Sequence, residues 1–224
     1  MSEKLPAPDA SRITRTRPTE EELLVLPVGT RFVRVHPLGG KRPRRWNEMR
    51  TWGPTKSRFD HHVPPPHDQD RAIAYVSHGD NAFTAALAEC FQDASGKGVG
   101  PVETVRRRLN MTVFDSAEPV VLLNLDSGWV TRAGGNNAIS SGSRARAREW
   151  ARAMYEAFGR IGSEPYIQGL AYRSSVWPPG QCAALWETAR EVFPGSPASS
   201  RLLADPAFAN ALSNAAEELE TYLV

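Results

Sequence analysis

The order of apolar and polar residues along the chain predicts four or five β-strands. Residues 30–36 alternate between polar side chains and β-branched or aromatic ones, which is the pattern of a strand with one buried face. Residues 72–77 form a short apolar run, as expected of a strand that is buried on both faces. Three further segments have a similar character. The candidate strands are residues 30–36, 72–77, 109–115, 118–126 and 166–174.

Helices are indicated where a capping residue precedes apolar side chains at i, i+3 and i+4 spacing. The clearest case begins after Asp205, a favourable N-cap, with Pro206 in the first turn. Two more helices are predicted to begin after Asp80 and Ser143, which are also N-cap residue types. The chain therefore combines strands with several helices.

Two shorter segments need separate interpretation. Thr19 and Glu22 have the spacing of a capping box, which predicts a short helix over residues 20–26. Residues 182–187 are compatible with either a strand or a helix, and their alanine content favours a helix.

The predicted elements follow one another in an irregular order and without a repeat, which indicates an α+β fold. Residues 1–18 are polar and rich in proline and arginine, so we expect a flexible N-terminal tail. Residues 19–224 then form a single domain that ends in a helix. Within it, residues 37–71 make a proline-rich, basic insertion, and a loop of that length is usually functional or disordered.

Composition and charge exclude several classes of protein. With 41% hydrophobic and 23% charged residues, the 224-residue chain resembles a globular protein and is not globally disordered. No apolar run approaches the roughly 18 residues of a membrane helix, and the N-terminus lacks the apolar segment of a secretory signal. We therefore expect a cytoplasmic protein without membrane contact. A net charge of +2 is far from the excess of a dedicated DNA-binding protein.

Metal chemistry is not expected either. The two cysteines have none of the spacings typical of zinc sites. His61, His62 and His67 lie close to Asp60, but adjacent histidines in a proline-rich loop are more often solvated than bound to metal. Walker, GxGxxG, GxSxG and HExxH motifs do not occur in the sequence.

Five polar residues lie on or beside the predicted elements and are the candidates for chemistry. Arg34 lies within the strand 30–36, and Arg58 precedes an aromatic residue in the insertion. Tyr75 lies in an apolar strand, Glu89 in the otherwise apolar helical run ALAECF, and Ser174 at the end of the run GLAYRS. Taken singly, each has an ordinary structural explanation, such as an exposed helix position for Glu89.

Taken together and in order, these residues resemble the RES family, named for its Arg, Glu and Ser, whose members include the toxins of RES–Xre toxin–antitoxin pairs. The matching pieces are Arg34 in an early RVH strand, Arg58 followed by an aromatic residue, and Tyr75 in an apolar strand. They are followed by Glu89 in the run ALAE and Ser174 in the run GLAYRS.

The likeness extends from about residue 30 to about residue 195. The family usually has a GGRWN-like run shortly before the strand tyrosine, whereas this chain has KSRFDHH and then the extra segment VPPPHDQDR. Arg45, in the run RWN, is therefore a rival match for the later arginine. We prefer Arg58, because Arg45 lies thirteen residues farther from Tyr75.

The resemblance implies a single domain with an ADP-ribosyltransferase-like fold that cleaves the nicotinamide–ribose bond of NAD. Arg34 and Arg58 would hold the diphosphate and ribose, and Tyr75 would present an aromatic face to the cationic nicotinamide. Glu89 would stabilise the positive charge that develops on the ribose, and Ser174 would hydrogen-bond either Glu89 or the nicotinamide amide. The acceptor stays open: water, phosphate or a protein would make the chain an NAD glycohydrolase, an NAD phosphorylase or an ADP-ribosyltransferase.

The resemblance also implies a partner. A toxin that drains NAD needs a separate antitoxin chain, for which we expect the basic loop 41–58 to be the contact surface. Two alternatives remain. The chain could be a catalytically inactive RES-like interaction protein, or a nucleic-acid-binding module that uses the basic loop with Trp46 and Trp52 as stacking residues.

Overall fold

The computed structural model describes residues 4–40, 42–93, 98–103, 108–164 and 166–224. These residues form a nine-stranded sheet in the order β1-β6-β7-β8-β4-β2-β5-β9, with β3 paired to β4. Neighbouring strands are antiparallel except β6 and β7, which are parallel. The strands are β1 (Leu23–Leu26), β2 (Arg31–Pro37), β3 (Arg50–Gly53), β4 (His67–His78), β5 (Leu109–Asp115), β6 (Val120–Asn124), β7 (Gly169–Arg173), β8 (Gln181–Trp186) and β9 (Ser199–Leu202).

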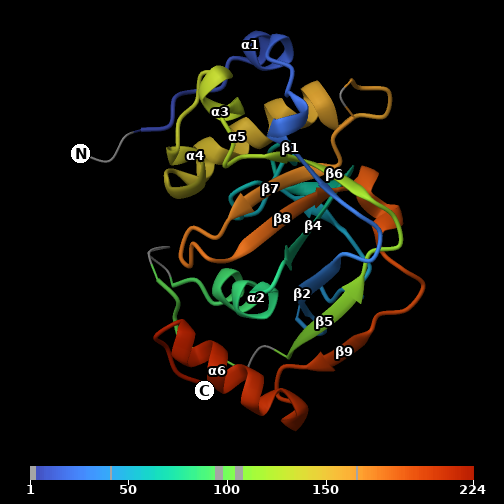
Figure 1. Ribbon diagram of the computed structural model, residues 1–224, viewed down its shortest axis with the longest axis vertical. Coiled ribbons are helices and arrows are strands. Elements are labelled where there is room, and N and C mark those ends of the chain that lie inside the picture. The colour runs from blue at the N-terminus through green and yellow to red at the C-terminus, as the bar shows by residue number, and fades with distance from the viewer. Residues whose placement is uncertain (1–3, 41, 94–97, 104–107, 165) are drawn as a thin grey trace.

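The helices form two groups, which lie beside different strands of the sheet (Figure 1). The first group, α1, α3, α4 and α5, lies beside β6, β7 and β8, whereas α2 and α6 lie beside β2 and β5. This mixture of helices with a mostly antiparallel sheet confirms the α+β class. The helices are α1 (Ala10–Arg15), α2 (Ala82–Cys90), α3 (Trp129–Arg132), α4 (Ala138–Ser141), α5 (Arg144–Met154) and α6 (Ala209–Glu218).

Strand register decides which side chains share a face with these helices. Tyr172 of β7 pairs with Cys182 of β8, which pairs with Ser77 of β4, which pairs with Val33 of β2. Directly paired residues point to the same side of a sheet, so these four side chains lie on one face. Both helix groups pack on this face, because their clusters contain Tyr172 and Cys182 at one end and Val33 at the other.

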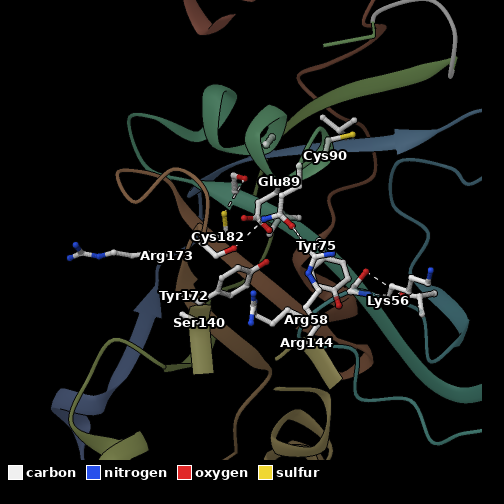
Figure 2. A pocket seen from close by; sticks show the side chains of 18 of the residues that line it. Lys56, Arg58, Tyr75, Glu89, Cys90, Ser140, Arg144, Tyr172, Arg173 and Cys182 are labelled. Carbon is white, nitrogen blue, oxygen red and sulfur yellow. Dashed lines mark hydrogen bonds between the residues drawn. The ribbon is translucent and has the colours of Figure 1, made fainter. Parts of the chain in front are cut away.

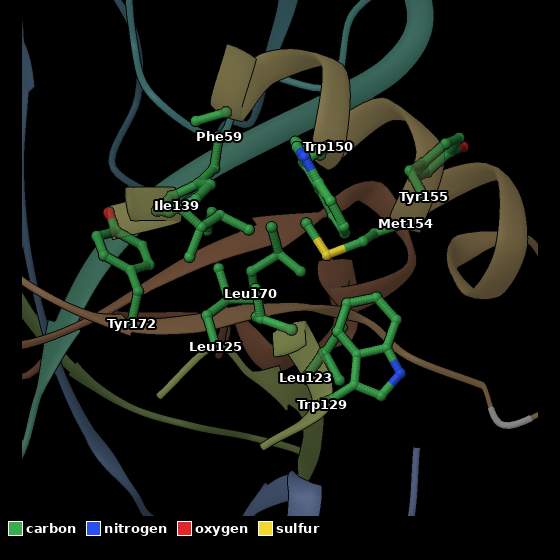
Figure 3. Packing of buried hydrophobic residues seen from close by; sticks show 14 of the residues in the cluster. Phe59, Leu123, Leu125, Trp129, Ile139, Trp150, Met154, Tyr155, Leu170 and Tyr172 are labelled. Atoms are coloured by element: carbon green, nitrogen blue, oxygen red, sulfur yellow. The ribbon is translucent and has the colours of Figure 1, made fainter. Parts of the chain in front are cut away.

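The first helix group covers the larger apolar core (Figure 3). Trp150 and Met154 of α5 and Trp129 of α3 pack over Leu123 and Leu170 of the sheet, and all five side chains are buried. Each buried Leu or Met side chain contributes about 1.5–3 kcal/mol relative to an exposed one. This cluster therefore fixes α5, whose first residues reach the functional cavity.

The expectation of a flexible tail over residues 1–18 is wrong for the described part of that segment. Leu5 and Ile13 are buried in the first core. The indole nitrogens of Trp150 and Trp129 donate hydrogen bonds to backbone carbonyls of the same segment, at 2.9 and 2.7 Å. The first three residues lie outside the described part of the chain. Two isolated apolar anchors in a polar segment produce no periodicity, so the pattern did not indicate them.

The five predicted strands are present as β2, β4, β5, β6 and β7. The helix predicted over residues 182–187 is wrong, because all but the last of these residues belong to β8, which pairs with both β4 and β7. Ala183 and Ala184 are fully buried on opposite faces of the sheet. A strand buried on both sides loses its alternation, and its alanines then imitate a helical segment.

The predicted caps differ in outcome. Helical turns begin after Ser143 and Asp205 as predicted, and both side chains accept N-cap hydrogen bonds. α2 has Asn81 rather than Asp80 at its N-cap position. The capping box is present, but the helix predicted over residues 20–26 is wrong beyond its first turn, because the residues that follow pair with β6 as strand β1.

The proline-rich insertion, residues 37–71, is more ordered than its composition suggests. It contains β3 and the beginning of β4. Between them, Asp60, His61 and His62 have no exposed surface. The expectation that adjacent histidines are solvated is therefore wrong for His61 and His62, whereas His67 is exposed.

Candidate functional site

A cavity of about 400 Å³ opens between the two helix groups, on the face of the sheet that both cover. Its volume falls within the roughly 300–1,000 Å³ typical of small-molecule sites. Strands β2, β4, β7 and β8 form its floor; α2, residues 55–58 and the corner between α4 and α5 form its walls (Figure 2). The residues that carry its chemistry are Lys56, Arg58, Tyr75, Glu89, Arg144, Tyr172, Arg173 and Cys182.

Glu89 reaches the cavity from the C-terminal end of α2. The helix packs closely on the sheet because Ala85, Ala86 and Ala88 are small and buried. This packing places Glu89 in the cavity wall, where Ser174 Oγ donates a 2.7 Å hydrogen bond to its Oε1. The hydrogen bond holds the side chain in one orientation, towards the cavity. The alternative interpretation of Glu89 as an exposed helix position is therefore wrong.

Burial governs the protonation of Glu89. Loss of water around the carboxyl group raises its pKa above the ordinary value, while the hydrogen bond from Ser174 and the charges of Arg58 and Arg144 act in the opposite direction. A carboxylate in this position is an under-solvated anion. It interacts more strongly with a developing positive charge than a solvated carboxylate does.

Ser174 lies just beyond the end of β7 and acts through Glu89. It is buried, and its oxygen also accepts hydrogen bonds from the backbone N–H groups of Val176 and Trp177, at 3.4 and 3.2 Å. These two donors fix the hydroxyl so that its own hydrogen points to Glu89. Ser174 is not among the residues that line the cavity, so it is a positioning residue for the carboxylate.

Two tyrosines form the aromatic part of the floor. Tyr75 comes from β4 and Tyr172 from β7, where the Tyr172 ring packs 4.6 Å from the ring of Phe59. Burial is the main reason that the pKa of each phenol is raised, and the charge of Glu89 raises both further. Both hydroxyls therefore stay protonated at neutral pH and can donate to a ligand.

Arg58 stands beside the corner between α4 and α5. Its Nη1 donates a 2.7 Å hydrogen bond to the carbonyl of Gly142, which lies in that corner. Gly142 allows the tight turn, because a Cβ atom there would lie 2.6 Å from the Ala138 carbonyl oxygen. Burial and the neighbouring charge of Arg144 lower the pKa of Arg58, while Glu89 raises it. The charges of Arg58 and Glu89 therefore each favour the ionised form of the other.

The backbone that carries Arg58 is anchored by Asp60. The Oδ2 atom of this carboxylate accepts hydrogen bonds from Arg50 at 2.8 Å and from the Thr55 backbone N–H and hydroxyl at 2.6 and 2.8 Å. His62 Nδ1 lies 2.5 Å from its Oδ1. Although burial opposes ionisation, the contacts with His62, Arg50 and Thr55 hold the pKa of Asp60 well below its usual range. Asp60 thereby ties the beginning of the wall segment 55–58, at Thr55, to the buried residues that follow the segment.

The structure brings four of the five predicted residues together. Arg58, Tyr75 and Glu89 line the cavity, and Ser174 bonds to Glu89. Arg34 is the exception. It is buried on the opposite face of β2, where its Nη1 and Nη2 donate to the carbonyls of Trp46 and Glu48, at 2.5 and 2.7 Å.

This placement corrects the expectation that Arg34 holds the ligand. The cavity takes its β2 side chains from Val33 and Val35, so the intervening residue points away from it. Arg45, the rival for the later arginine, is exposed and is not a lining residue. Of Arg45 and Arg58, the structure therefore places Arg58 at the site.

A metal site and a nucleic-acid-binding surface have less support from the geometry. In the described ranges, no group of His, Cys, Asp and Glu is arranged to hold a metal ion. Trp46 packs against the rings of Phe114 and Phe193, and the guanidinium of Arg42 lies 3.6 Å from the ring of Trp52. Both stacking residues of the nucleic-acid alternative are thus already in contact with other side chains, and Lys41 of its basic cluster lies outside the described residues.

Sequence reasoning missed several lining residues. Arg144 is one of four arginines in the run RARAREWAR, and nothing in that run distinguishes the one that faces the cavity. Gln92 and Ser175 line the cavity beside it and share a 3.1 Å hydrogen bond. Only Tyr172 carried a usable signal, because it belongs to the run GLAYRS that also contains Ser174.

Comparison with known proteins adds no relative. No family model, no curated protein and no solved structure matches the chain. Among the described residues, no helix has both the length and the apolar character needed to cross a membrane. A functional assignment must therefore start from the cavity itself.

Proposed function

We propose that the protein is an NAD-consuming enzyme of the RES type that cleaves the bond between nicotinamide and ribose. The observation that supports this most strongly is the position of Glu89, a largely buried carboxylate fixed by Ser174 in a cavity that also contains Arg58 and two tyrosines. These are the residue types that such a reaction needs, and they come from segments far apart in the sequence.

Glu89 is the group that lowers the barrier. When the glycosidic bond breaks, its electron pair leaves with the nitrogen of nicotinamide, and positive charge develops on the ribose ring. A fixed carboxylate stabilises this charge without reorganising, an effect typically worth about 3–4 kcal/mol. The acceptor, which is water, phosphate or a protein side chain, then bonds to the anomeric carbon and loses a proton to the solvent or to a neighbouring base.

The other lining residues bind and orient the substrate. Tyr75 and Tyr172 offer aromatic surface to the cationic nicotinamide ring, a contact worth about 0.5–2 kcal/mol. Arg58 supplies charged donors for the diphosphate. A cavity of about 400 Å³ is large enough to enclose part of a dinucleotide, with the remainder at its mouth.

An enzyme that drains NAD needs control, so the proposal includes a separate antitoxin chain. The basic loop 41–58 ends at the cavity, where Lys56 and Arg58 are lining residues, and an acidic partner seated there would cover the opening. We expect expression of the chain alone to inhibit bacterial growth, and Glu89→Gln to relieve the inhibition. Normal growth with unchanged NAD at high expression of the unaltered chain would remove the reason to expect an antitoxin.

The decisive experiment is incubation of the purified protein with NAD, with and without phosphate and with candidate protein acceptors, followed by quantification of nicotinamide and identification of the second product. Glu89→Gln should release little nicotinamide. Glu191→Gln, an exposed glutamate outside the cavity, is the matched control and should behave as the unaltered protein. NAD that remains intact under every condition would contradict the enzymatic proposal and favour the inactive RES-like alternative.

A further inference from the structure

Two guanidinium groups lie close to each other in the lining of the cavity. Arg58 comes from the wall segment 55–58, and Arg144 is the first residue of α5 (Figure 2). They lie close enough for the charge of Arg144 to lower the pKa of Arg58. Each has a neutral hydrogen-bond partner: Arg58 donates to the Gly142 carbonyl, and Arg144 donates to the side-chain oxygen of Gln92.

The cavity carries an excess of positive charge. Its cationic lining residues are Lys56, Arg58, Arg144 and Arg173, whereas Glu89 is the one carboxylate among its described lining residues. Arg173 is exposed and lies 3.4 Å from Asp126, so its charge is partly compensated. The other three cations are brought together with one carboxylate, Glu89, among them. The excess of positive charge is unfavourable unless an anion occupies the space between them.

We propose that Arg144 is a ligand-binding residue that holds the phosphate groups of the ligand together with Arg58. Each guanidinium has five N–H donors, and each uses one of them on the neutral partner named above. The remaining donors of the two side chains can bind adjacent phosphate oxygens of a diphosphate. Gln92 holds the Arg144 side chain in the cavity lining through its hydrogen bond, so it is a positioning residue.

This inference rests on the proposed function for the identity of the natural ligand, and on the cavity alone for the preference for an anion. Arg144 also provides a second arginine for the ligand, a role that the family resemblance had given to Arg34. The Nη atoms of Arg34 are engaged by backbone carbonyls on the other face of the sheet. Arg144 takes its place in the cavity from a different part of the chain.

The test is isothermal titration of the full chain with inorganic pyrophosphate and, separately, with ADP-ribose, at low ionic strength. Arg144→Met should weaken binding of both by about 10- to 100-fold, as expected when hydrogen bonds to a charged group are lost. Arg144→Lys should recover only part of the affinity, because lysine keeps the charge but not the fork of donors. Arg148→Met is the matched control, since it removes the same charge from the next turn of α5 outside the cavity.

Gln92→Leu separates ligand binding from a structural role. If Arg144 only ties α5 to the segment after α2, Arg144→Met and Gln92→Leu should have the same effect, and that result would overturn the inference. If Arg144 touches the ligand, its replacement should weaken binding several-fold more than replacement of Gln92. Equal binding by Arg144→Met and the unaltered protein, or the failure of the unaltered protein to bind either probe at millimolar concentration, would also overturn it.

Failure of the proposed function gives a different result. Pyrophosphate binding that depends on Arg144, without release of nicotinamide from NAD, would leave the anion site in place and refute the enzymatic proposal. Release of nicotinamide that does not change in Arg144→Met, with unchanged probe binding, would support the enzyme and refute the role of Arg144.

Discussion

Asp60 and Glu89 are two largely buried carboxylates that the fold treats in opposite ways. Asp60 has no exposed surface and accepts hydrogen bonds from Arg50, Thr55 and His62. Glu89 lies in an open cavity and accepts one side-chain hydrogen bond, from Ser174, with the Ser175 backbone N–H as a further donor. The surroundings lower the pKa of Asp60 and raise that of Glu89.

The difference is the one expected between a structural carboxylate and a ligand-binding one. A buried charge whose hydrogen-bonding capacity is filled by the protein has nothing left to offer a ligand, and it serves to fix the chain. A buried charge that is only partly compensated destabilises the folded protein. Such a charge is typical of sites where a ligand completes the interaction. Asp60 thus anchors the wall segment 55–58, and Glu89 is the group that this wall helps to enclose.

The largest effect that tests this comparison is on stability. Asp60→Ala should destabilise the protein by about 3–5 kcal/mol, because it leaves the buried Arg50 without its partner. For a chain of this length, that loss corresponds to a fall in Tm of about 6–20 °C. Asp70→Ala, an exposed aspartate on β4, should change stability by less than about 0.5 kcal/mol. Thermal unfolding followed by circular dichroism measures both, and equal stability of the two variants would contradict the anchoring role.

Glu89→Gln should reverse the pattern, with a large loss of activity and no loss of stability. Removal of the charge should lower the rate of nicotinamide release by about 100- to 1,000-fold, the usual effect of deleting one electrostatic contact in a transition state. The amide can still accept the hydrogen bond from Ser174, so the local structure should be kept. Near-normal turnover by a folded Glu89→Gln protein would show that this carboxylate does not stabilise the reacting charge.

Part of this site could be predicted from the sequence, and the limits have physical causes. Glu89, Tyr75 and Ser174 were found because they lie in short runs whose order resembles a known family, and order survives large changes of sequence. Whether a strand residue faces the cavity depends on register, which pairs Val33 with Ser77 and turns Arg34 to the other side. A single sequence does not contain that pairing.

The same limit explains which elements of the fold were missed. β8 is buried on both faces, so it lacks the alternation that revealed β2. The anchoring of Asp60 depends on Arg50, ten residues earlier, and on the turn at Thr55 between them. Contacts of this kind follow from tertiary packing, which outweighs the local signals of a proline-rich segment.

A smaller effect should distinguish the two candidate arginines. Arg58→Met should raise the NAD concentration needed for half-maximal activity by about 10- to 100-fold, because hydrogen bonds to a charged phosphate are lost. Arg45→Met should leave it unchanged, since Arg45 is exposed and outside the cavity. Steady-state kinetics on the two variants decide between them. The reverse result would move the functional loop to residues 41–45.

The smallest expected effect is the pH dependence of stability. Burial raises the pKa of Glu89 in the folded state, so its contribution to stability is present below the unfolded pKa and is lost as the pH rises through the folded one. At about pH 4 the carboxyl group is mostly protonated in the folded state, and Glu89→Gln should have nearly the Tm of the unaltered protein.

At pH 7 to 8 the unaltered protein carries an under-solvated carboxylate that the variant lacks, so Glu89→Gln should be the more stable of the two. We expect this advantage in Tm to appear as the pH rises above the range in which the carboxyl group is protonated. The contribution of Asp60 has the opposite sign, because its lowered pKa makes its stabilisation disappear as the pH falls. Calorimetric scans at several pH values measure the difference, and Glu191→Gln should show none of it because this glutamate is exposed. A Tm difference between Glu89→Gln and the unaltered protein that stays constant with pH, or that grows towards low pH, would show that Glu89 is as well compensated as Asp60.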